Sequence, residues 1–283
     1  MSNRRLFINK SFTTLASISL LPALNSFGIE TSLETNNKLV KHKLRFALVS
    51  DGHFGQSNTP YIENYNNMVK WINQEHKTNR LDFVIVNGDI VHDRPDLLET
   101  VNRQHFSKFK IPYYVTAGNH DFADNKLWKS VFGYDADYVF ERQGIGFIAA
   151  NTSNPKGEFL CPDNVFLKKQ LEYFKNHAVV FIVLHIPPTK WLNEEFYNAE
   201  CEETLNLLHS YPNVKAAFHG HDHSVDGVRY TNKLPHFFDA HFGGNWGTVY
   251  KGYRIVEISD DNTIFTYQVN ASKNPVLNSN QIK

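Results

Sequence analysis

From residue 43 onward, short apolar runs rich in β-branched residues alternate with longer segments of helical period. Residues 44–50 and 82–87 are two such runs, and residues 61–76 between them carry apolar side chains at spacings of three and four. A helical segment over 96–109 leads to a third run over 112–116. Parallel strands joined by crossover helices produce this alternation. The pattern predicts a βαβαβ unit and an α/β fold.

The second half of the chain mixes antiparallel and parallel signals. Its predicted elements are, in order, a hairpin of 138–142 with 146–151, a helix over 163–177, a strand over 179–184, a helix over 201–209, a strand over 214–218, and a hairpin of 254–258 with 263–269. We expect two sheets with helices outside, in one catalytic domain over residues 43–270. Residues 271–283 are rich in Asn, Ser and Lys, and we expect a loose C-terminal tail.

Residues 1–28 have the features of an export signal. Arg4 and Arg5 precede a mostly apolar stretch over 12–24, and no acidic residue occurs before Glu30. The paired arginines followed by Leu-Phe-Ile resemble a twin-arginine signal, so we expect an exported, periplasmic protein. The stretch is too short and too polar for a stable membrane span, which needs about 20 apolar residues. The alternative is the frayed N-terminal helix of a cytosolic protein, and no cleavage site is assigned.

Charge and cysteine content limit the classes of partner. Lys plus Arg and Asp plus Glu both number 29, and no basic run of the kind that binds nucleic acid is present, so we expect no nucleic-acid partner. Nothing in the sequence indicates the oligomeric state. Cys161 and Cys201 are too few for a disulfide scaffold. Export would permit them to pair, but we expect buried thiols, the common state of free cysteines.

Polar side chains of the kinds that bind metal ions follow five of the apolar runs, each near the end of a predicted strand. They are Asp51, His53, Asp89, Asn119, His185, His221 and His223. Ligands in open α/β sheets bind at the carboxyl ends of parallel strands, so we expect these groups to converge. Residues i and i+2 of an extended chain point to the same side, which lets Asp51 and His53 hold one ion together.

The donor types narrow the choice of ion. Two carboxylates, one amide and four imidazoles suit Mn, Fe or Zn rather than Ca, which requires an all-oxygen shell. Seven ligands exceed what one ion with an open position can use. The sequence therefore predicts two divalent or trivalent metal ions, with Asp89 as the bridge because an ionised carboxylate can bind through both oxygens.

The ordered set of motifs resembles the calcineurin-like metallophosphoesterase family over roughly residues 44–258. The motifs are Asp51-Gly52-His53, Gly88-Asp89, Gly118-Asn119-His120-Asp121, His185 and Gly220-His221-Asp222-His223. The resemblance implies an α/β fold that is a four-layer αββα sandwich of two mixed β-sheets flanked by helices. It also implies a dinuclear centre in which Asp51, His53 and His223 hold one ion, Asn119, His185 and His221 hold the other, and Asp89 is shared.

The resemblance extends to two residues beside the ions. His120 matches the family's histidine next to the Asn ligand, and we expect it to act as a general acid with Asp121 orienting its imidazole. The alternative is that His120 only forms a hydrogen bond with a metal ligand. Where many members carry an Asp three positions after the bridging Asp, this chain has His92, followed by Asp93. We expect Arg94 to pair with a neighbouring acidic residue.

These features predict hydrolysis of a small phosphodiester, of nucleotide or glycerophosphodiester type, by in-line attack of a hydroxide that bridges the two ions. A phosphomonoesterase or a nucleotide pyrophosphatase would use the same metal centre. A catalytically silent protein-binding scaffold is the alternative from another class, disfavoured by the complete ligand set. The loop over 237–246 is expected to be a pocket wall, through substrate contact or by covering the core.

Overall fold

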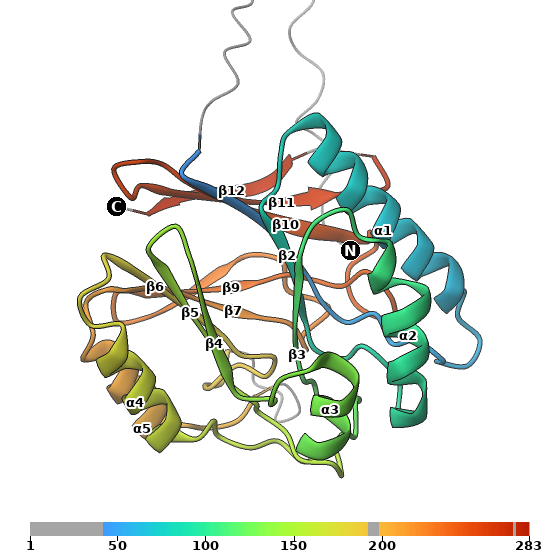
Figure 1. Cartoon of the computed structure of the whole chain (residues 1–283), viewed down its shortest axis with the longest axis horizontal. Helices are drawn as coiled ribbons and strands as arrows, with labels where there is room; N and C mark the ends of the chain where they lie inside the picture. Colours follow the sequence, from blue (N-terminus) through green and yellow to red (C-terminus); the bar gives the residue numbers. More distant parts are fainter. Residues whose placement is uncertain (1–41, 192–197, 274–275, 283) are drawn as a thin grey trace, which may run out of the picture. The chain divides into compact units, whose positions relative to one another are not determined.

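Two six-stranded sheets pack against each other in the computed structural model, which describes residues 42–191, 198–273 and 276–282 (Figure 1). The first sheet has the order β12-β11-β10-β1-β2-β3, and its strands are β1 (Leu44–Val49), β2 (Phe83–Asn87), β3 (Tyr113–Thr116), β10 (Gly252–Ile258), β11 (Ile264–Asn270) and β12 (Val276–Ile282). Strands β1, β2 and β3 are parallel neighbours, whereas β10, β11 and β12 extend the sheet in antiparallel fashion.

The second sheet has the order β4-β5-β6-β7-β9-β8. Its strands are β4 (Tyr138–Arg142), β5 (Ile145–Ala149), β6 (Val179–Val183), β7 (Val214–His219), β8 (Val228–Thr231) and β9 (Leu234–Phe238). The inner strands β5, β6, β7 and β9 are parallel, and an antiparallel strand closes each edge. Both sheets are thus mixed, and both present the carboxyl ends of parallel strands.

Helices cover the outer face of each sheet, which completes four layers (Figure 1). The helices are α1 (Tyr61–Thr78), α2 (Leu98–Gln104) and α3 (Asn125–Phe132) on the first sheet, and α4 (Asn164–Tyr173) and α5 (Glu202–His209) on the second. Short 3-10 turns over Pro95–Leu97 and Phe106–Lys108 flank α2. The predicted αββα sandwich is confirmed.

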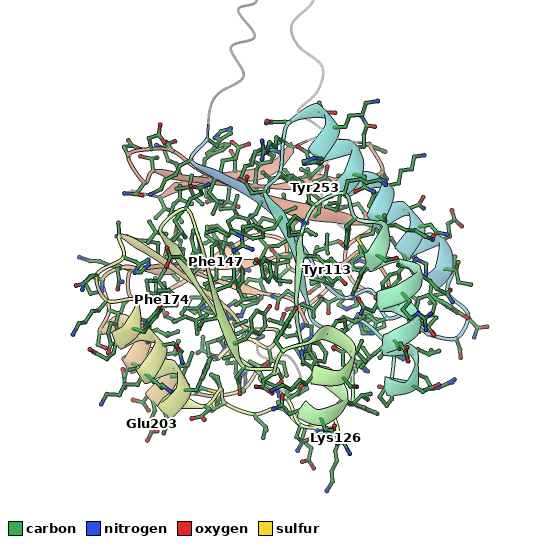
Figure 2. The ribbon with its side chains drawn as sticks, in the orientation of Figure 1. Tyr113, Lys126, Phe147, Phe174, Glu203 and Tyr253 are labelled. Atoms are coloured by element: carbon green, nitrogen blue, oxygen red, sulfur yellow. A yellow bond between two sulfur atoms is a disulfide. The ribbon has the colours of Figure 1, made fainter. Side chains whose placement is uncertain are left out.

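Alternation along the strands explains the layers. In β1, Phe46 and Leu48 face the second sheet, whereas Ala47 and Val49 face the helices. Phe46 stacks on Phe83 with ring centroids 4.9 Å apart, and such aromatic contacts fill the space between the sheets. Figure 2 shows Phe147 in this interior, while Lys126 and Glu203 project outward from α3 and α5. Both faces of the inner strands are buried, as expected for sheets covered on both sides.

Several elements differ from the sequence-based expectations. The helix predicted over 96–109 is broken into a 3-10 turn, α2 and a second 3-10 turn. Helix α3 and strands β8 and β9 were not predicted. Residues 276–282 are not a loose tail, because they pair with β11 as edge strand β12. Helix α1, strand β6 and the two hairpins lie close to their predicted positions.

The expectation of two free thiols was wrong, since Cys161 and Cys201 form a disulfide. Cys161 is exposed and Cys201 is buried at the start of α5. The loops after β5 and before α5 meet in the fold although the two cysteines lie 40 residues apart in sequence. The bond therefore joins two loops on the side of the second sheet that carries α4 and α5.

The predicted export signal over residues 1–28 lies outside the described residues. Among the helices of the described part, none is long and apolar enough to cross a membrane.

Candidate metal centre

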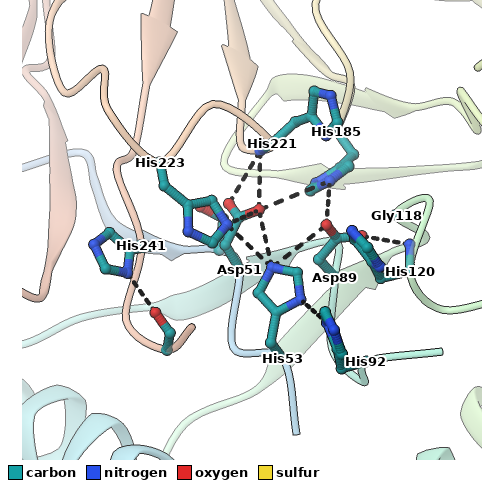
Figure 3. A network of polar contacts seen from close by, with 12 residues as sticks. Asp51, His53, Asp89, His92, Gly118, His120, His185, His221, His223 and His241 are labelled. Carbon is teal, nitrogen blue, oxygen red and sulfur yellow. Dashed lines mark hydrogen bonds and ion pairs between the residues drawn. The ribbon is translucent and has the colours of Figure 1, made fainter. Parts of the chain in front are cut away.

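The seven predicted ligands all follow strand ends in the structure: three strands of the first sheet and two of the second supply them. Asp51 and His53 follow β1, Asp89 follows β2 and Asn119 follows β3, while His185 follows β6 and His221 and His223 follow β7. The two sheets bring these ends together in one buried cluster (Figure 3). The signal read from the sequence, a polar residue just beyond an apolar run, thus located the cluster.

Two groups of donor atoms lie inside the cluster, and a third lies beside it. Asp51, His53 and His223 form the first group, and Asp89, His185 and His221 form the second. His53, His92 and His120 form the third, and in each group the ligand atoms lie within 4.8 Å of one another. Nε2 of His53 lies 3.0 Å from Nε2 of His223 and 3.6 Å from Oδ2 of Asp89, which connects the groups. The grouping matches the division between two ions that the resemblance implies, with Asp89 next to both.

Asn119 lies beside the same cluster. The backbone N–H of the next residue, His120, donates to Oδ1 of Asp89 at 2.8 Å, which fixes the Asn119 loop against the carboxylate. A Cβ on Gly118 would lie 2.2 Å from the backbone nitrogen of Asp89, so only glycine permits this approach. The side-chain Oδ1 of Asn119 is buried and has no hydrogen-bond partner among the described residues.

The backbone carrying the ligands departs from the extended form assumed for Asp51 and His53. Asp51, His53, Asp89 and His221 all have positive φ, at 60°, 47°, 50° and 67°. This left-handed region costs a non-glycine residue roughly 1 kcal/mol or more and is frequent at functional sites. The side chains therefore converge through tight turns after each strand, and not through the i, i+2 geometry of an extended chain.

Hydrogen bonds on the outer ring nitrogens turn three imidazoles inward. His185 donates from Nδ1 to the carbonyl of Asn87 at 2.7 Å, and His223 donates from Nδ1 to the carbonyl of Trp246 at 3.3 Å. Nδ1 of His53 lies 3.0 Å from Nδ1 of His92. Each partner leaves Nε2 facing the cluster, the arrangement by which proteins orient histidine ligands.

Charge is strongly coupled within the cluster. Burial alone would lower the pKa of His185, but the charges of Asp89 and Asp51 raise it to about 10. Burial opposes ionisation of Asp89, yet His185 holds the pKa of that carboxyl well below its ordinary value. Burial lowers the pKa of His53 well below its usual range, which Asp89 only partly offsets. The cluster thus contains ionised carboxylates beside imidazoles that compete for positive charge.

The donor set fits metal ions. Nε2 of His185 lies 3.2 Å from Oδ2 of Asp89 as an ion pair, and Oδ1 of Asn119 is buried without a hydrogen-bond partner among the described residues. Buried polar atoms are normally satisfied, and unsatisfied ones call for an explanation such as an ion. Imidazole and carboxylate donors at this density are typical of transition-metal or zinc sites. These residues together form a candidate dinuclear centre.

His120 lies at the edge of the cluster with its side chain 28% exposed. Nδ1 of His120 lies 2.7 Å from Oδ1 of Asp93. Burial would lower the pKa of His120, but the charge of Asp89 and the hydrogen bond with Asp93 raise it. The imidazole is therefore held beside the cluster by a carboxylate, with Nε2 left for other contacts.

The expectation that Asp121 orients His120 was wrong. The Asp121 carboxylate is fully buried and accepts hydrogen bonds from the backbone N–H groups of Val91 and Gly118 at 2.9 and 2.8 Å. Burial, and then the charge of Asp89, raise its pKa to about 7. Asp121 ties together the loops after β2 and β3, and the orienting carboxylate is Asp93, which the sequence analysis had noted only as a departure from the family pattern.

Three further side chains border the cluster. His92 stacks on His120 with ring centroids 4.8 Å apart, Trp246 stacks on His223 at 4.2 Å, and Phe159 packs edge-on against His221 at 4.8 Å. His92 was noted in the sequence only as a departure from the family pattern, and Trp246 ends the loop that was expected to be a pocket wall. Phe159 carried no signal because its neighbours are ordinary loop residues. Arg94 pairs with Asp96 at 2.6 Å, as expected.

Comparison with known proteins identifies one matching family. A model of the calcineurin-like phosphoesterase family matches residues 44–225. A probable cyclic nucleotide phosphodiesterase of Coxiella burnetii is 22% identical over 199 residues, which are 68% of this chain and 80% of that protein. The uncharacterized protein YvnB of Bacillus subtilis is 27% identical over 117 residues, 40% of this chain but only 9% of that much longer protein.

Solved structures show the same fold at low sequence identity. A dimetal phosphatase from Danio rerio superposes with a TM-score of 0.71 and 14% identity, covering 86% of this chain and 99% of that one. The purple acid phosphatase PPD1 from yellow lupin superposes with a TM-score of 0.63 and 15% identity, covering 84% of this chain and 53% of that one. At these identities the likeness establishes the architecture alone.

Proposed function

The chain belongs to the calcineurin-like phosphoesterase family, and from this premise we propose that it hydrolyses a small phosphodiester, of nucleotide or glycerophosphodiester type. The observation that carries the proposal is the placement of His120: its imidazole lies beside the two buried donor groups, with Nδ1 2.7 Å from Oδ1 of Asp93, and it shares a third, less buried group of possible ligands with His53 and His92. A protonatable group in that position can supply the proton that a departing alkoxide needs.

Two ions would be held by the residues that the structure brings together. Asp51, His53 and His223 would hold one, and Asn119, His185 and His221 the other, with Asp89 shared between them. The chemistry that such a bound pair supplies is the activation of water near neutral pH and the neutralisation of charge on the phosphoryl oxygens. The donor types suit Mn, Fe or Zn.

The remaining steps belong to the protein. His120 donates a proton from Nε2 to the leaving oxygen, while Asp93 fixes the ring through Nδ1 and the stacked His92 limits its rotation. Asp121 holds the backbone at Val91 and Gly118, so that the loops carrying Asp89 and His120 keep their relative position. Preorganisation of this kind is a large part of enzymatic rate enhancement.

The preference for a diester is supported by the Coxiella burnetii relative, which matches over most of its length and is described as a probable cyclic nucleotide phosphodiesterase. A general acid assists the departure of a poor alkoxide leaving group, which any unactivated phosphoester carries. A phosphomonoesterase or nucleotide pyrophosphatase would use the same residues, and the test below separates these activities.

The test is hydrolysis by protein reconstituted with Mn, Fe or Zn. We expect kcat/KM for bis(p-nitrophenyl) phosphate to exceed that for p-nitrophenyl phosphate by about tenfold or more, a difference of about 1.4 kcal/mol in transition-state binding. Faster hydrolysis of the monoester would show that the protein is a phosphomonoesterase. Two bound ions with no hydrolysis of any phosphoester would support a protein-binding scaffold.

We further propose that the protein is exported through its twin-arginine-like N-terminus. The disulfide between Cys161 and Cys201 supports this proposal, because such bonds persist in oxidising compartments. In cells producing the full chain, the protein should appear in the periplasmic fraction. Replacing Arg4 and Arg5 together by lysine should retain it in the cytoplasm, and an unchanged distribution would count against this route.

A further inference from the structure

Trp246 lies directly against the candidate metal centre and is far more exposed than the side chains it touches. Its ring is stacked on His223 with centroids 4.2 Å apart and planes 7° apart, and it lies 4.8 Å from the ring of His53. Trp246 is 36% exposed, whereas His53 and His223 are 0% and 1% exposed. Because one face of the indole is covered by His223, its exposed surface lies away from that ring, beside the candidate metal centre.

The loop that carries Trp246 is held in place by close contacts with His223. Gly247 has a φ of 101°, and a Cβ there would lie 2.3 Å from Cβ of His223, so this close approach requires glycine. Thr248 donates its backbone N–H to the carbonyl of His223 at 2.9 Å. His241 stacks on His223 with ring centroids 4.8 Å apart (Figure 3). The two ring nitrogens of His241 contact the carbonyls of Gly243 and Thr248.

Trp246 also lies on the same side of the cluster as the proposed acid. The His53 ring is 4.9 Å from the His120 ring and 4.8 Å from the Trp246 ring, and His92 contacts both neighbours, at 4.8 Å from His120 and 6.3 Å from Trp246. An ester group that leaves beside His120 therefore departs next to an exposed indole.

A rigid, exposed aromatic side chain beside a candidate phosphate-binding site is suited to stacking. Aromatic side chains bind nucleobases through their π-faces, and each such contact changes affinity by roughly 5- to 150-fold. Aliphatic alcohols such as glycerol offer no comparable partner. Trp246 could therefore stack on a nucleotide ester but not on a glycerophosphodiester, although the metal centre suits both.

We propose that Trp246 is a specificity-determining residue that stacks on the nucleobase of a nucleotide ester bound at the metal centre. This inference rests on the proposed phosphodiesterase function, which it narrows from small phosphodiesters in general to nucleoside phosphoesters. Trp246 does not take part in proton transfer, and its contribution appears in binding of the base.

The test compares two phosphates that differ in the base, adenosine 5′-monophosphate and ribose 5-phosphate, binding to the Mn-loaded full-length protein in calorimetric titrations. In the native chain we expect the nucleotide to bind roughly tenfold tighter. The ratio should fall to about one in Trp246→Leu and stay within about threefold of native in Trp246→Phe, which keeps an aromatic face. Tyr230→Leu, which removes an exposed aromatic from β8, is the matched control and should keep the native ratio.

Equal binding of the two phosphates by the native chain would overturn the inference, even if phosphodiesters are hydrolysed. So would loss of affinity for both phosphates in equal proportion in Trp246→Leu, since that result assigns the indole only to the support of His223. Metal content of each variant, measured by mass spectrometry, shows whether His223 still binds. Because calorimetry needs no turnover, failure of the proposed hydrolysis is detected separately by the ester assay.

Discussion

Two buried histidines, His185 in the candidate metal centre and His105 in the helical layer outside it, have opposite properties. His185 faces Asp89 and Asp51 at 3.2 and 3.9 Å, and these charges overcome burial and raise its pKa to about 10. His105 is 3% exposed among the rings of Phe54 and Tyr65, where burial lowers its pKa to about 4. Burial by itself therefore lowers the pKa of a histidine in this protein, whereas the carboxylates of the cluster reverse that effect and make it a region that accepts cations.

The same contrast extends to His219 and His236, which lie in the second sheet beneath the centre. Nε2 of His219 lies 2.9 Å from Nδ1 of His236, and Nδ1 of His219 donates to the carbonyl of Leu184. Burial lowers the pKa of His219 well below its ordinary value and that of His236 to about 3. Although His219 is only two residues from His221, no carboxylate faces it among the contacts of the described chain, and it stays neutral.

The largest expected effect is on kcat, and it distinguishes a catalytic histidine from histidines that only pack in the interior. His120→Ala should keep both metal ions but lower kcat by roughly 10²- to 10⁴-fold on an unactivated dinucleotide, because the leaving oxygen loses its proton donor. The loss on bis(p-nitrophenyl) phosphate, whose leaving group needs no proton, should be much smaller. Steady-state kinetics on both substrates measure the difference.

Asp93→Asn is the matched control for that variant. It keeps the shape of the side chain that holds His120 but removes its charge, so its kcat on the dinucleotide should fall between those of the native chain and His120→Ala. Equal losses on both substrates in His120→Ala would remove the acid role and leave His120 as a neighbour of the metal ligands.

The two regions can also be compared by what stabilises them, since His105 lies in a packed interior whereas a disulfide joins two loops beside the second sheet. Cys201→Ser opens the bond to Cys161 and should lower the free energy of unfolding by about 2 to 4 kcal/mol, for a pair 40 residues apart in sequence. Urea denaturation measures this loss. Cys161→Ser should match it, and native protein in a reducing buffer should approach both; a change under about 0.5 kcal/mol would show that the loops need no covalent link.

The smallest expected effect concerns the pH dependence of stability. Since His105 has a pKa of about 4 in the folded chain against 6.5 ordinarily, the unfolded chain binds more protons between these values. Stability is therefore retained above about pH 6.5 and falls as the pH drops toward 4, by about 1 to 2 kcal/mol on reaching pH 5. His105→Phe should remove this part of the dependence, as measured by denaturation at pH 7 and pH 5. An identical pH profile in the variant would show that titration of His105 does not contribute to the pH dependence of stability.

Sequence patterns predicted the interior and the ligands for definable reasons. Strand β6 is a continuous apolar run and β1 is apolar apart from Arg45, and the ligand motifs follow them directly, so local sequence located both. Strand β9 contains Pro235 and is short, and β12 has little apolar alternation, so tertiary pairing rather than local preference determines them. Helix α3 did have local signals, with Asp124 capping its first turn and Gly133 ending it, but eight residues gave too short a period to recognise.

The details around the centre depend on contacts that sequence order does not reveal. Asp121 is adjacent to His120, yet Asp93, which lies 27 positions away, is the carboxylate that reaches its ring. Cys161 and Cys201 meet because two loops converge, and nothing in their spacing predicts that approach. Residue types at strand ends could therefore be predicted, whereas the partners that orient them required the folded chain.

The central claim is that the buried cluster at the strand ends holds two metal ions, and metal analysis of purified protein by mass spectrometry tests it most directly. We expect two ions per chain in the native protein, one after His53→Ala or His185→Ala, and none after Asp89→Ala, because its carboxylate lies beside both donor groups. A native protein that binds at most one ion per chain when Mn, Fe and Zn are supplied in excess would contradict the account.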